Sequence, residues 1–316
     1  MILSSFLVFP VTLFLIPLFI RMGRKVGLVV EEKERIPLTG GWLLFLVVFP
    51  LLLSLSFPLT LIIAMGLVFL MGLWDDFREL SPLTKILIQS VAALLVILSS
   101  LHTTIARIPL FLNYLITFLW IVGIVNAFNF LDIMDGLSPL MGILSLLGIC
   151  LVAGFNKNSD IFILSLGILS FLLAFLLFNF PPARIFLGNS GSYLLGFFLG
   201  FMVIPLSFAP PQHEIALLTP LLLLGLPLLD TFYLILRRWK EGKPVYRKSK
   251  DHLALVLRER GWEERKVLLF MGGISSIFVF SGVLITRLKN LYASLYLVFL
   301  LTIVLFIFKR VGLWRR

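Results

Sequence analysis

Two amides and two carboxylates recur at every third position near the end of an otherwise apolar run, as Asn126, Asn129, Asp132 and Asp135. Residues three apart on a helix are surface neighbours, so this spacing places the four side chains in one slanted row. A carboxylate at the end of a membrane-length apolar run is costly, and it is therefore a candidate for a functional site. The alternative is an ordinary helix end that Asn and Asp cap and Gly136 terminates. Capping explains one or two of these polar residues but not four in register.

A second acidic feature is the adjacent pair Asp75 and Asp76, which joins two apolar runs and is followed by Lys85. Adjacent carboxylates repel each other, and they are retained where a divalent cation or a basic partner offsets their charge. The alternative is that both acids occupy the cap and first turn of the next helix. The pair is a candidate for binding a metal ion.

Small residues open a later apolar run in the segment 186–192, which contains Gly188 and Ser190. Such residues at a helix N-terminus leave backbone N–H groups free to meet phosphate oxygens. A plain turn is the simpler explanation of so short a loop taken alone. The loop indicates a phosphate-binding site only when it is considered together with the other features.

The fourth feature is a strongly basic segment after Asp230, with eleven Lys and Arg residues between 237 and 266. It begins with Arg237 and Arg238 and contains Lys250 and His252. So many cations would attract anionic lipid headgroups or a nucleotide diphosphate. Anchoring the chain at a membrane would need only a few of them, and a single His is usually an ordinary polar loop residue.

The elements that must position these residues are membrane helices. Hydrophobic residues make up 60% of the 316-residue chain and charged residues 14%, the composition of a polytopic membrane protein. We predict an all-α fold with about eleven transmembrane helices, forming one domain over residues 1–316 with a basic loop at about 237–266. The expected spans are 2–20, 42–57, 58–74, 86–101, 111–128, 137–154, 161–180, 191–209, 215–235, 267–286 and 290–308.

The distribution of charge predicts the orientation of these helices. Of the 27 Lys and Arg residues, 23 lie at the C-terminus or in loops that follow odd-numbered spans, which predicts an outside N-terminus and a cytoplasmic C-terminus. This topology explains the net charge of +11, so nucleic acid is not an expected partner. Of the 16 acidic residues, 14 lie in or beside the same cytoplasmic segments. Acidic residues do not follow the positive-inside rule, so their clustering predicts a site on that face.

Together these features predict chemistry on phosphates at the cytoplasmic membrane face. Clustered Asp and Asn oxygens suit Mg²⁺, which keeps substrate phosphates in its coordination shell. Lys and Arg would neutralise charge during phosphoryl transfer. A polar site on so apolar a fold implies one substrate dissolved in the cytosol and another embedded in lipid.

The chain resembles the polyprenyl-phosphate N-acetylhexosamine-1-phosphate transferase family over nearly its whole length. The resemblance rests on Asp75-Asp76 with Lys85, the run Asn126 to Leu137, the loop Phe186 to Ser192, Asp251-His252, Gly40-Gly41 and Asp230. It implies transfer of a sugar-1-phosphate from a UDP-sugar to undecaprenyl or another polyprenyl phosphate, with release of UMP and with Mg²⁺, or Mn²⁺ in its place. The short chain and the basic loop favour the UDP-GlcNAc branch over the phospho-MurNAc-pentapeptide branch. Members of this family often form dimers, so a homodimer is an expected assembly.

The resemblance also implies a role for each matching residue. The expected catalytic residues are Asp75, Asp76, Asp132, Asp135 and His252. The expected substrate-binding residues are Lys85, Asn126, Asn129, Gly188, Ser190, Arg237, Arg238 and Lys250, and the expected metal ligands are Asp75, Asp76, Asp132, Asp135 and Asn189. The enzyme would start a lipid-linked cell-envelope glycan as a multi-pass protein of a bacterial-type inner membrane, with its active site facing the cytoplasm.

The chain departs from the family pattern at three positions. Asn189 stands where the family has an Asp that binds the metal, His252 stands alone where the family has two or three histidines, and Ile133 interrupts an Asp-Gly repeat. An amide oxygen can coordinate a hard cation but lacks the charge of a carboxylate, so we expect an active enzyme with a raised Mg²⁺ requirement. An inactive homologue, or a transporter or lipid scramblase using the same acids, is the alternative. The signature of a third class, the CDP-alcohol phosphotransferases, is absent.

Overall fold

The computed structural model describes residues 2–30, 35–206, 213–243 and 251–311, and for Val311 it describes the backbone alone. Within these residues the chain is mostly helical, and the one sheet is a two-stranded antiparallel ribbon, β1 (Val29–Val30) with β2 (Ile36–Pro37). Seven of the described helices are long and apolar enough to cross a membrane, or eight if one bent pair counts as a single span. The predicted class of helical multi-pass membrane protein is confirmed.

Each expected span coincides with a helix or a pair of helices. The helices are α1 (Ile2–Val26), α2 (Gly40–Leu53), α3 (Leu59–Phe77), α4 (Pro82–Leu98), α5 (Leu110–Leu131), α6 (Leu137–Phe155), α7 (Ser159–Asn179), α8 (Gly188–Met202), the 3₁₀ turn η1 (Glu214–Leu218), α9 (Thr219–Leu223), α10 (Gly225–Lys240), α11 (Leu253–Glu259), α12 (Glu264–Ile285) and α13 (Asn290–Val311).

The ninth expected span is broken rather than continuous. The helical residues Glu214–Leu223 and Gly225–Lys240 are bent by 75° at Leu224. Pro220 and Pro227 flank the break, and proline cannot donate the backbone hydrogen bond that a continuous helix requires. Helices α2 and α4 are apolar but shorter than a membrane span, so the predicted number of eleven spans exceeds what the described helices support by length.

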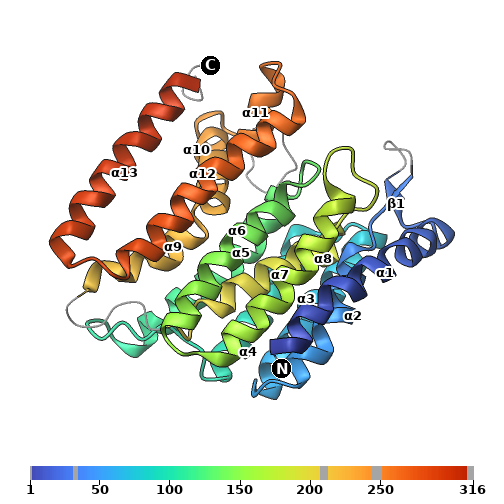
Figure 1. The fold of residues 1–316 in the computed structure, drawn as a ribbon, viewed down its shortest axis with the longest axis horizontal. Coiled ribbons are helices and arrows are strands. Elements are labelled where there is room, and N and C mark those ends of the chain that lie inside the picture. Colours follow the sequence, from blue (N-terminus) through green and yellow to red (C-terminus); the bar gives the residue numbers. More distant parts are fainter. Residues whose placement is uncertain (1, 31–34, 207–212, 244–250, 312–316) are drawn as a thin grey trace. The chain divides into compact units, whose positions relative to one another are not determined.

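The chain divides into two compact units, Met1–Leu206 and Ser207–Arg316. In the first unit, α1 and α6 pack on α7, while α3 and α5 pack on α8, as the ribbons of Figure 1 show. Every residue of α8 except Asn189 is buried, so this helix forms the centre of the unit. Nonpolar side chains exposed on its outer helices are those that lipid would cover. The single domain expected over residues 1–316 stays a prediction.

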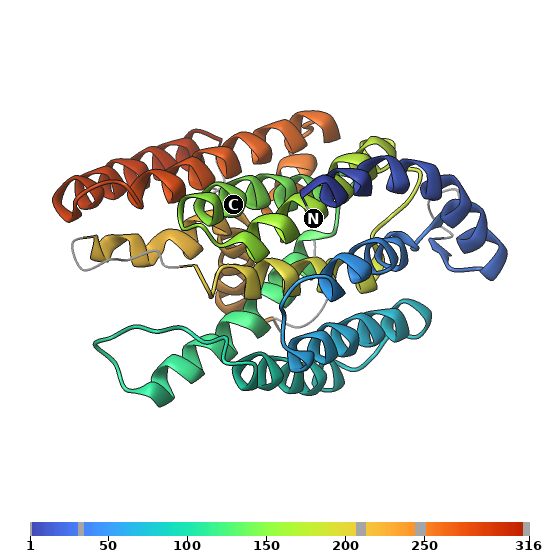
Figure 2. The same cartoon turned by 60° about the horizontal axis from the view of Figure 1, so that its bottom comes forward.

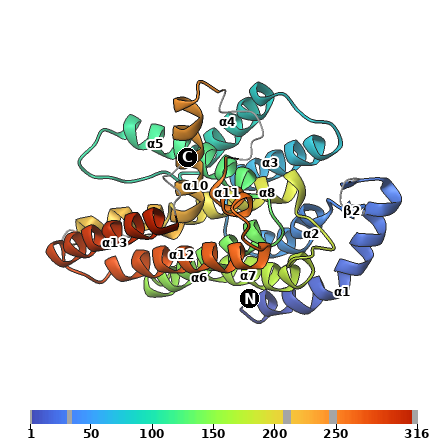
Figure 3. The same cartoon turned by 90° about the horizontal axis from the view of Figure 1, so that it is seen from above.

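The short ribbon connects the end of α1 to the start of α2 (Figure 3). The residues from β2 to the start of α2 form backbone hydrogen bonds with the loop before α8. Phe186 donates its N–H to the Pro37 carbonyl. Gly40 and Gly41 donate to the carbonyls of Phe186 and Leu187 at 2.9 and 2.8 Å. The loop that precedes α8 is therefore held in place by the backbone of a segment that is distant in the sequence.

The second unit contains η1 and the helices α9 to α13. Helix α12 packs on α9, α10 and α11, and α13 lies antiparallel beside α12 (Figures 1 and 2). Side chains of α12 and α13 face each other across a small apolar gap lined by Ile274, Ile277, Val304, Ile307 and Phe308. The unit thus has an apolar helix pair with a polar cluster on α10 and α11. Orientation of the two termini across a membrane stays a prediction.

Candidate active site

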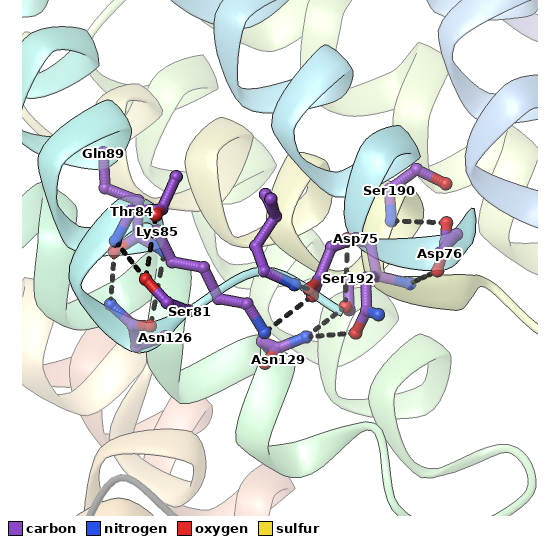
Figure 4. A network of polar contacts seen from close by, with 12 residues as sticks. Asp75, Asp76, Ser81, Thr84, Lys85, Gln89, Asn126, Asn129, Ser190 and Ser192 are labelled. Carbon is purple, nitrogen blue, oxygen red and sulfur yellow. Dashed lines mark hydrogen bonds and ion pairs between the residues drawn. The ribbon is translucent and has the colours of Figure 1, made fainter. Parts of the chain in front are cut away.

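The C-terminal end of α3 carries the predicted acid pair, and its first member is paired with the predicted lysine (Figure 4). The Asp75 carboxylate lies 2.8 Å from the Lys85 ammonium of α4 and accepts the backbone N–H of Leu80 at 2.8 Å. The Asp75 side chain is only 1% exposed and the Lys85 side chain 18%. A buried carboxylate needs such a partner, since an unpaired buried charge is strongly destabilising.

The second member of the pair, Asp76, caps the first turn of α8. Its two carboxylate oxygens accept the backbone N–H groups of Asn189 at 2.6 Å and Ser190 at 3.0 Å. These are N–H groups that a helix N-terminus leaves without a partner inside the helix, and a carboxylate there also favours the helix dipole. In this structure Asp76 thus occupies two of the N–H groups that the sequence suggested could meet a phosphate, and the phosphate contact stays a prediction.

Two glycines allow α3 and α8 to meet this closely. A Cβ atom on Gly72 would lie 2.5 Å from the Cα of Ser190, so only glycine fits at this crossing. Gly188 has a φ of +71°, and a Cβ there would lie 2.9 Å from Asp76 Oδ2. The predicted substrate-binding residue Gly188 thus has a clear steric role at the cap.

The amide of Asn129 connects α5 to the start of α8. It donates hydrogen bonds to Asn189 Oδ1 at 3.0 Å and to Ser192 Oγ at 3.1 Å. Asn129 and Asn189, far apart in the sequence, are therefore brought together as predicted. The Asn189 side-chain oxygen, which would be a metal ligand in the predicted scheme, accepts this amide hydrogen.

A reciprocal amide pair joins α4 to α5 one helical turn from Lys85. Gln89, which is buried, exchanges hydrogen bonds with Asn126 at 2.6 and 3.3 Å, and Asn126 also donates to the Val122 carbonyl at 2.8 Å. Asn126 was predicted to bind substrate, but in this structure its amide holds two helices together. The pair fixes the rotation of α4, and Lys85 lies on the same face four residues before Gln89.

The last predicted acid of the Asn/Asp row, Asp135, anchors a turn. Its carboxylate accepts the backbone N–H of Ala183 at 2.9 Å. The buried amide of Asn179 accepts the N–H of Gly136 at 2.9 Å and donates to the Ile185 carbonyl at 2.7 Å. These contacts tie the turn before α6 to the turn before α8. Asp132 lies at the C-terminal end of α5, half-buried.

Sequence reasoning missed three buried polar residues of this unit. Gln89 could have been found from its position four residues after Lys85 on one helix, and Asn179 from its polar side chain at the end of an apolar run. Tyr193 of α8 is buried beside Asp75. The sequence does not mark Tyr193 as a site residue, because a tyrosine inside an apolar helix is expected to pack in the core.

In the second unit, the predicted residues of the basic segment form a separate polar cluster. Asp230 of α10 contacts His252 Nδ1 at 2.7 Å. Asp251 lies 3.3 Å from the Nε atoms of both Arg237 and Arg238. Lys250 lies outside the described residues. The two arginines and the histidine are therefore each held by a carboxylate.

The oxygen atoms around Asp75 and Asp76 are compatible with a magnesium ion. Among the described residues, no group of three or more His, Cys, Asp or Glu side chains is placed to hold a metal ion. Mg²⁺ commonly uses only one or two carboxylates and takes its remaining ligands from substrate phosphates and water. Carboxylates on adjacent residues and a neighbouring amide oxygen fit this pattern, whereas a site built from four acids is not formed. The metal and its ligands stay predictions.

Comparisons with known proteins identify relatives of this chain. A model of glycosyl transferase family 4 matches residues 58–207, which include the whole network of Figure 4. The chain is 30% identical to a probable undecaprenyl-phosphate N-acetylglucosaminyl 1-phosphate transferase of Bacillus subtilis, an alignment covering 96% of this chain and 89% of the relative.

Two other relatives come from both branches of the predicted family. A decaprenyl-phosphate N-acetylglucosaminephosphotransferase of Mycolicibacterium smegmatis is 31% identical over 70% of this chain and 64% of the relative. A phospho-N-acetylmuramoyl-pentapeptide-transferase of Levilactobacillus brevis is 28% identical over 82% of this chain and 87% of the relative. With its membrane helices and an alignment over nearly its full length, the chain belongs to glycosyl transferase family 4.

Proposed function

We propose that this protein transfers a sugar-1-phosphate, most simply GlcNAc-1-phosphate, from a UDP-sugar to undecaprenyl or another polyprenyl phosphate at the cytoplasmic face of a bacterial-type inner membrane. The observation that carries the proposal is the network joining α3, α4, α5 and α8, which lies wholly within the family match. The name of the Bacillus subtilis relative supports GlcNAc. The phospho-N-acetylmuramoyl-pentapeptide-transferases among the relatives supply the second candidate substrate.

The proposed reaction exchanges one phosphoanhydride bond for another. An oxygen of the lipid phosphate attacks the phosphorus that carries the sugar, a new P–O–P bond forms, and the bond to the UMP oxygen breaks. A phosphate monoester is mostly dianionic at pH 7, so its oxygen attacks without a strong general base. The contribution of the protein is then the positioning of both phosphates and the neutralisation of their charge.

The residues of the first unit have distinct parts in this scheme. Lys85, positioned by Asp75 and by the Gln89 amide pair, supplies a cation for the phosphates. Asp76 holds the first turn of α8 and with it the side chain of Asn189. Asp75, Asp76 and Asn189 would hold Mg²⁺, which when bound supplies charge neutralisation at the phosphate oxygens.

The direct test incubates the purified protein in lipid with radiolabelled UDP-GlcNAc, undecaprenyl phosphate and Mg²⁺, and measures UMP and lipid-linked sugar phosphate. We expect both products in equal amounts. UDP-MurNAc-pentapeptide in a parallel sample distinguishes the two branches. Absence of UMP from every UDP-N-acetylhexosamine at saturating Mg²⁺ or Mn²⁺ would contradict the proposal, and transport or lipid scrambling by the same protein would replace it.

The metal requirement is tested by Asn189→Asp. The substitution restores a full charge at the proposed ligand, so we expect half-maximal activity at a lower Mg²⁺ concentration, by about tenfold if the added attraction is worth about 1.4 kcal/mol. Titration of activity with Mg²⁺ after removal of metal by a chelator measures the shift. An unchanged Mg²⁺ dependence would exclude residue 189 as a ligand.

A further inference from the structure

The end of α7 carries a buried amide that contacts two separate segments of the first unit. Asn179 is 3% exposed. Its Oδ1 accepts the backbone N–H of Gly136 at 2.9 Å, and its Nδ2 donates to the backbone carbonyl of Ile185 at 2.7 Å. A backbone N–H can only donate and a carbonyl can only accept, so these two partners fix which way the amide faces.

The two segments are the turn between α5 and α6 and the loop that precedes α8. Gly136, with a φ of +74°, ends the turn and precedes α6. Its neighbour Asp135 accepts the backbone N–H of Ala183 in the loop at 2.9 Å. The turn and the loop are thus joined at two places, by the carboxylate of Asp135 and by the amide of Asn179.

The loop leads to the start of α8 and to the network of Figure 4. Ile185 lies four residues before Asn189, whose side-chain oxygen accepts a hydrogen bond from Asn129 at 3.0 Å. The turn carries Asp132, three residues after Asn129. The amide of Asn179 therefore sets the spacing between two segments, and each of them carries a polar side chain of the candidate site.

Packing alone does not require an amide at the end of α7. Leucine has the same branched shape as asparagine, and a buried polar group is costly unless its hydrogen bonds are formed. The amide of Asn179 forms them with backbone groups of two segments that are distant in the sequence. Those backbone groups also need partners, because they are buried as well. The polarity of Asn179 thus serves to connect the two segments.

We propose that Asn179 is a positioning residue for the transfer reaction, acting through the turn that carries Asp132 and the loop that leads to Asn189. The inference rests on the proposed function. Asn179 itself touches no substrate. Its amide keeps the turn and the loop at the separation at which their polar side chains act together on the substrates, and catalysis is sensitive to such spacing.

The decisive variant is Asn179→Leu, which keeps the shape of the side chain and removes both hydrogen bonds. The turn and the loop can then shift relative to each other. We expect kcat/KM for UMP release, per folded molecule, to fall by about 100-fold, the loss that a misplacement of about 1 Å can cause. The KM for at least one of the two substrates should rise. Asn179→Asp keeps an acceptor for the N–H of Gly136, so its loss should be smaller.

Asn113→Leu is the matched control, because Asn113 is another buried asparagine of the first unit whose amide holds a loop. It is 4% exposed, accepts the backbone N–H of Ile105 at 2.8 Å and donates to the carbonyl of the same residue at 3.3 Å. It lies in the first turn of α5, and these partners belong to the loop between α4 and α5. The control should lower the unfolding temperature as Asn179→Leu does but leave both KM values unchanged.

Hydrogen exchange of the backbone amides supplies a readout that does not depend on activity. The N–H of Gly136 should exchange faster in Asn179→Leu than in the wild type, because it loses its acceptor. In Asn113→Leu it should exchange at the wild-type rate. Mass spectrometry of peptides that contain the turn measures the difference.

Three results would overturn the positioning role of Asn179. They are wild-type KM values for both substrates in folded Asn179→Leu, a loss of kcat/KM no greater than that of Asn113→Leu, and unchanged exchange at Gly136. If Asn179→Leu does not fold, the same measurements on Asn179→Asp decide. An inactive wild-type protein would instead overturn the proposed function, while hydrogen exchange still decides whether Asn179 holds the turn.

Discussion

In the unit Met1–Leu206, the carboxylates of Asp76 and Asp135 accept backbone N–H groups, whereas in the unit Ser207–Arg316 those of Asp230 and Asp251 hold histidine and arginine side chains. The first kind of contact fixes the ends of helices and the path of a turn. The second kind orients histidine and arginine side chains. Aspartate residues therefore stabilise the backbone in the polar region of the first unit, and they orient side chains in that of the second.

Asp75 combines the two kinds of contact, as Asp230 does. It accepts one backbone N–H and also holds a lysine, so it resembles the second unit in its choice of a cationic partner. The Asp75 side chain is 1% exposed and that of Asp251 14%, so an unpaired charge at Asp75 would be the more costly of the two. The comparison predicts that substitutions in the first unit reduce stability and activity together, while those in the second unit reduce activity with little change in stability.

The largest effect is expected for Lys85→Met. It leaves the buried Asp75 carboxylate without its cation, which should lower the free energy of unfolding by about 3–5 kcal/mol. Unfolding of the protein in detergent or lipid measures the loss. Asp75→Asn combined with Lys85→Met removes both charges and should recover most of the stability without recovering activity. A single variant as stable as the wild type would show that the ion pair does not hold α3 and α4 together.

A smaller loss of stability is expected for Asp76→Asn. The amide can accept only one of the two N–H groups at the start of α8, so stability should fall by about 1 kcal/mol. UMP release should fall by about 100-fold, the scale seen when one fixed electrostatic contact is lost from an active site. Asp160→Asn serves as the control at a helix N-terminus outside the network. Full activity in Asp76→Asn would remove this residue from the catalytic set.

The smallest effect on stability is expected for Asp251→Asn in the second unit. The Arg237 side chain is 34% exposed and that of Asp251 14%, so water screens at least one of the two ion pairs. The free energy of unfolding should change by less than about 1 kcal/mol. The measured quantities are unfolding and the KM for UDP-GlcNAc, which should rise because the arginines lose their orientation. A large loss of stability would show that the cluster of the second unit is structural, as in the first.

Much of the fold could be predicted from the sequence because membrane insertion is governed by local hydropathy. Every expected span overlaps a helix or the bent pair, and the helix ends differ mostly by a few residues. The sequence predicted a continuous span over 215–235 and not the bend at Leu224, although Pro220 and Pro227 lie on either side of it. Proline marks where a helix can break, but the packing of its neighbours decides whether it bends.

The candidate site was predictable as a set of residues but not as a set of contacts. Asp75, Lys85, Asn129 and Asn189 do meet in one network, as their motifs suggested (Figure 4). The partners of Asp76 lie 113 and 114 positions away, and no periodicity links residues so distant. Gln89 and Asn179 stand out as polar residues in the sequence, but their partners do not, because those depend on which segment faces them.

The sequence by itself determined that the chain forms membrane helices, in which segments they lie, and to which family it belongs. Composition, run length and local motifs carry this information, and none of it needs contacts between distant residues. Only the tertiary structure decided that Asp76 caps a helix from another helix, that Asn126 pairs with Gln89, and that Asp230 orients His252. A carboxylate or an amide can accept many donors, and which donor it meets is set by how the helices pack.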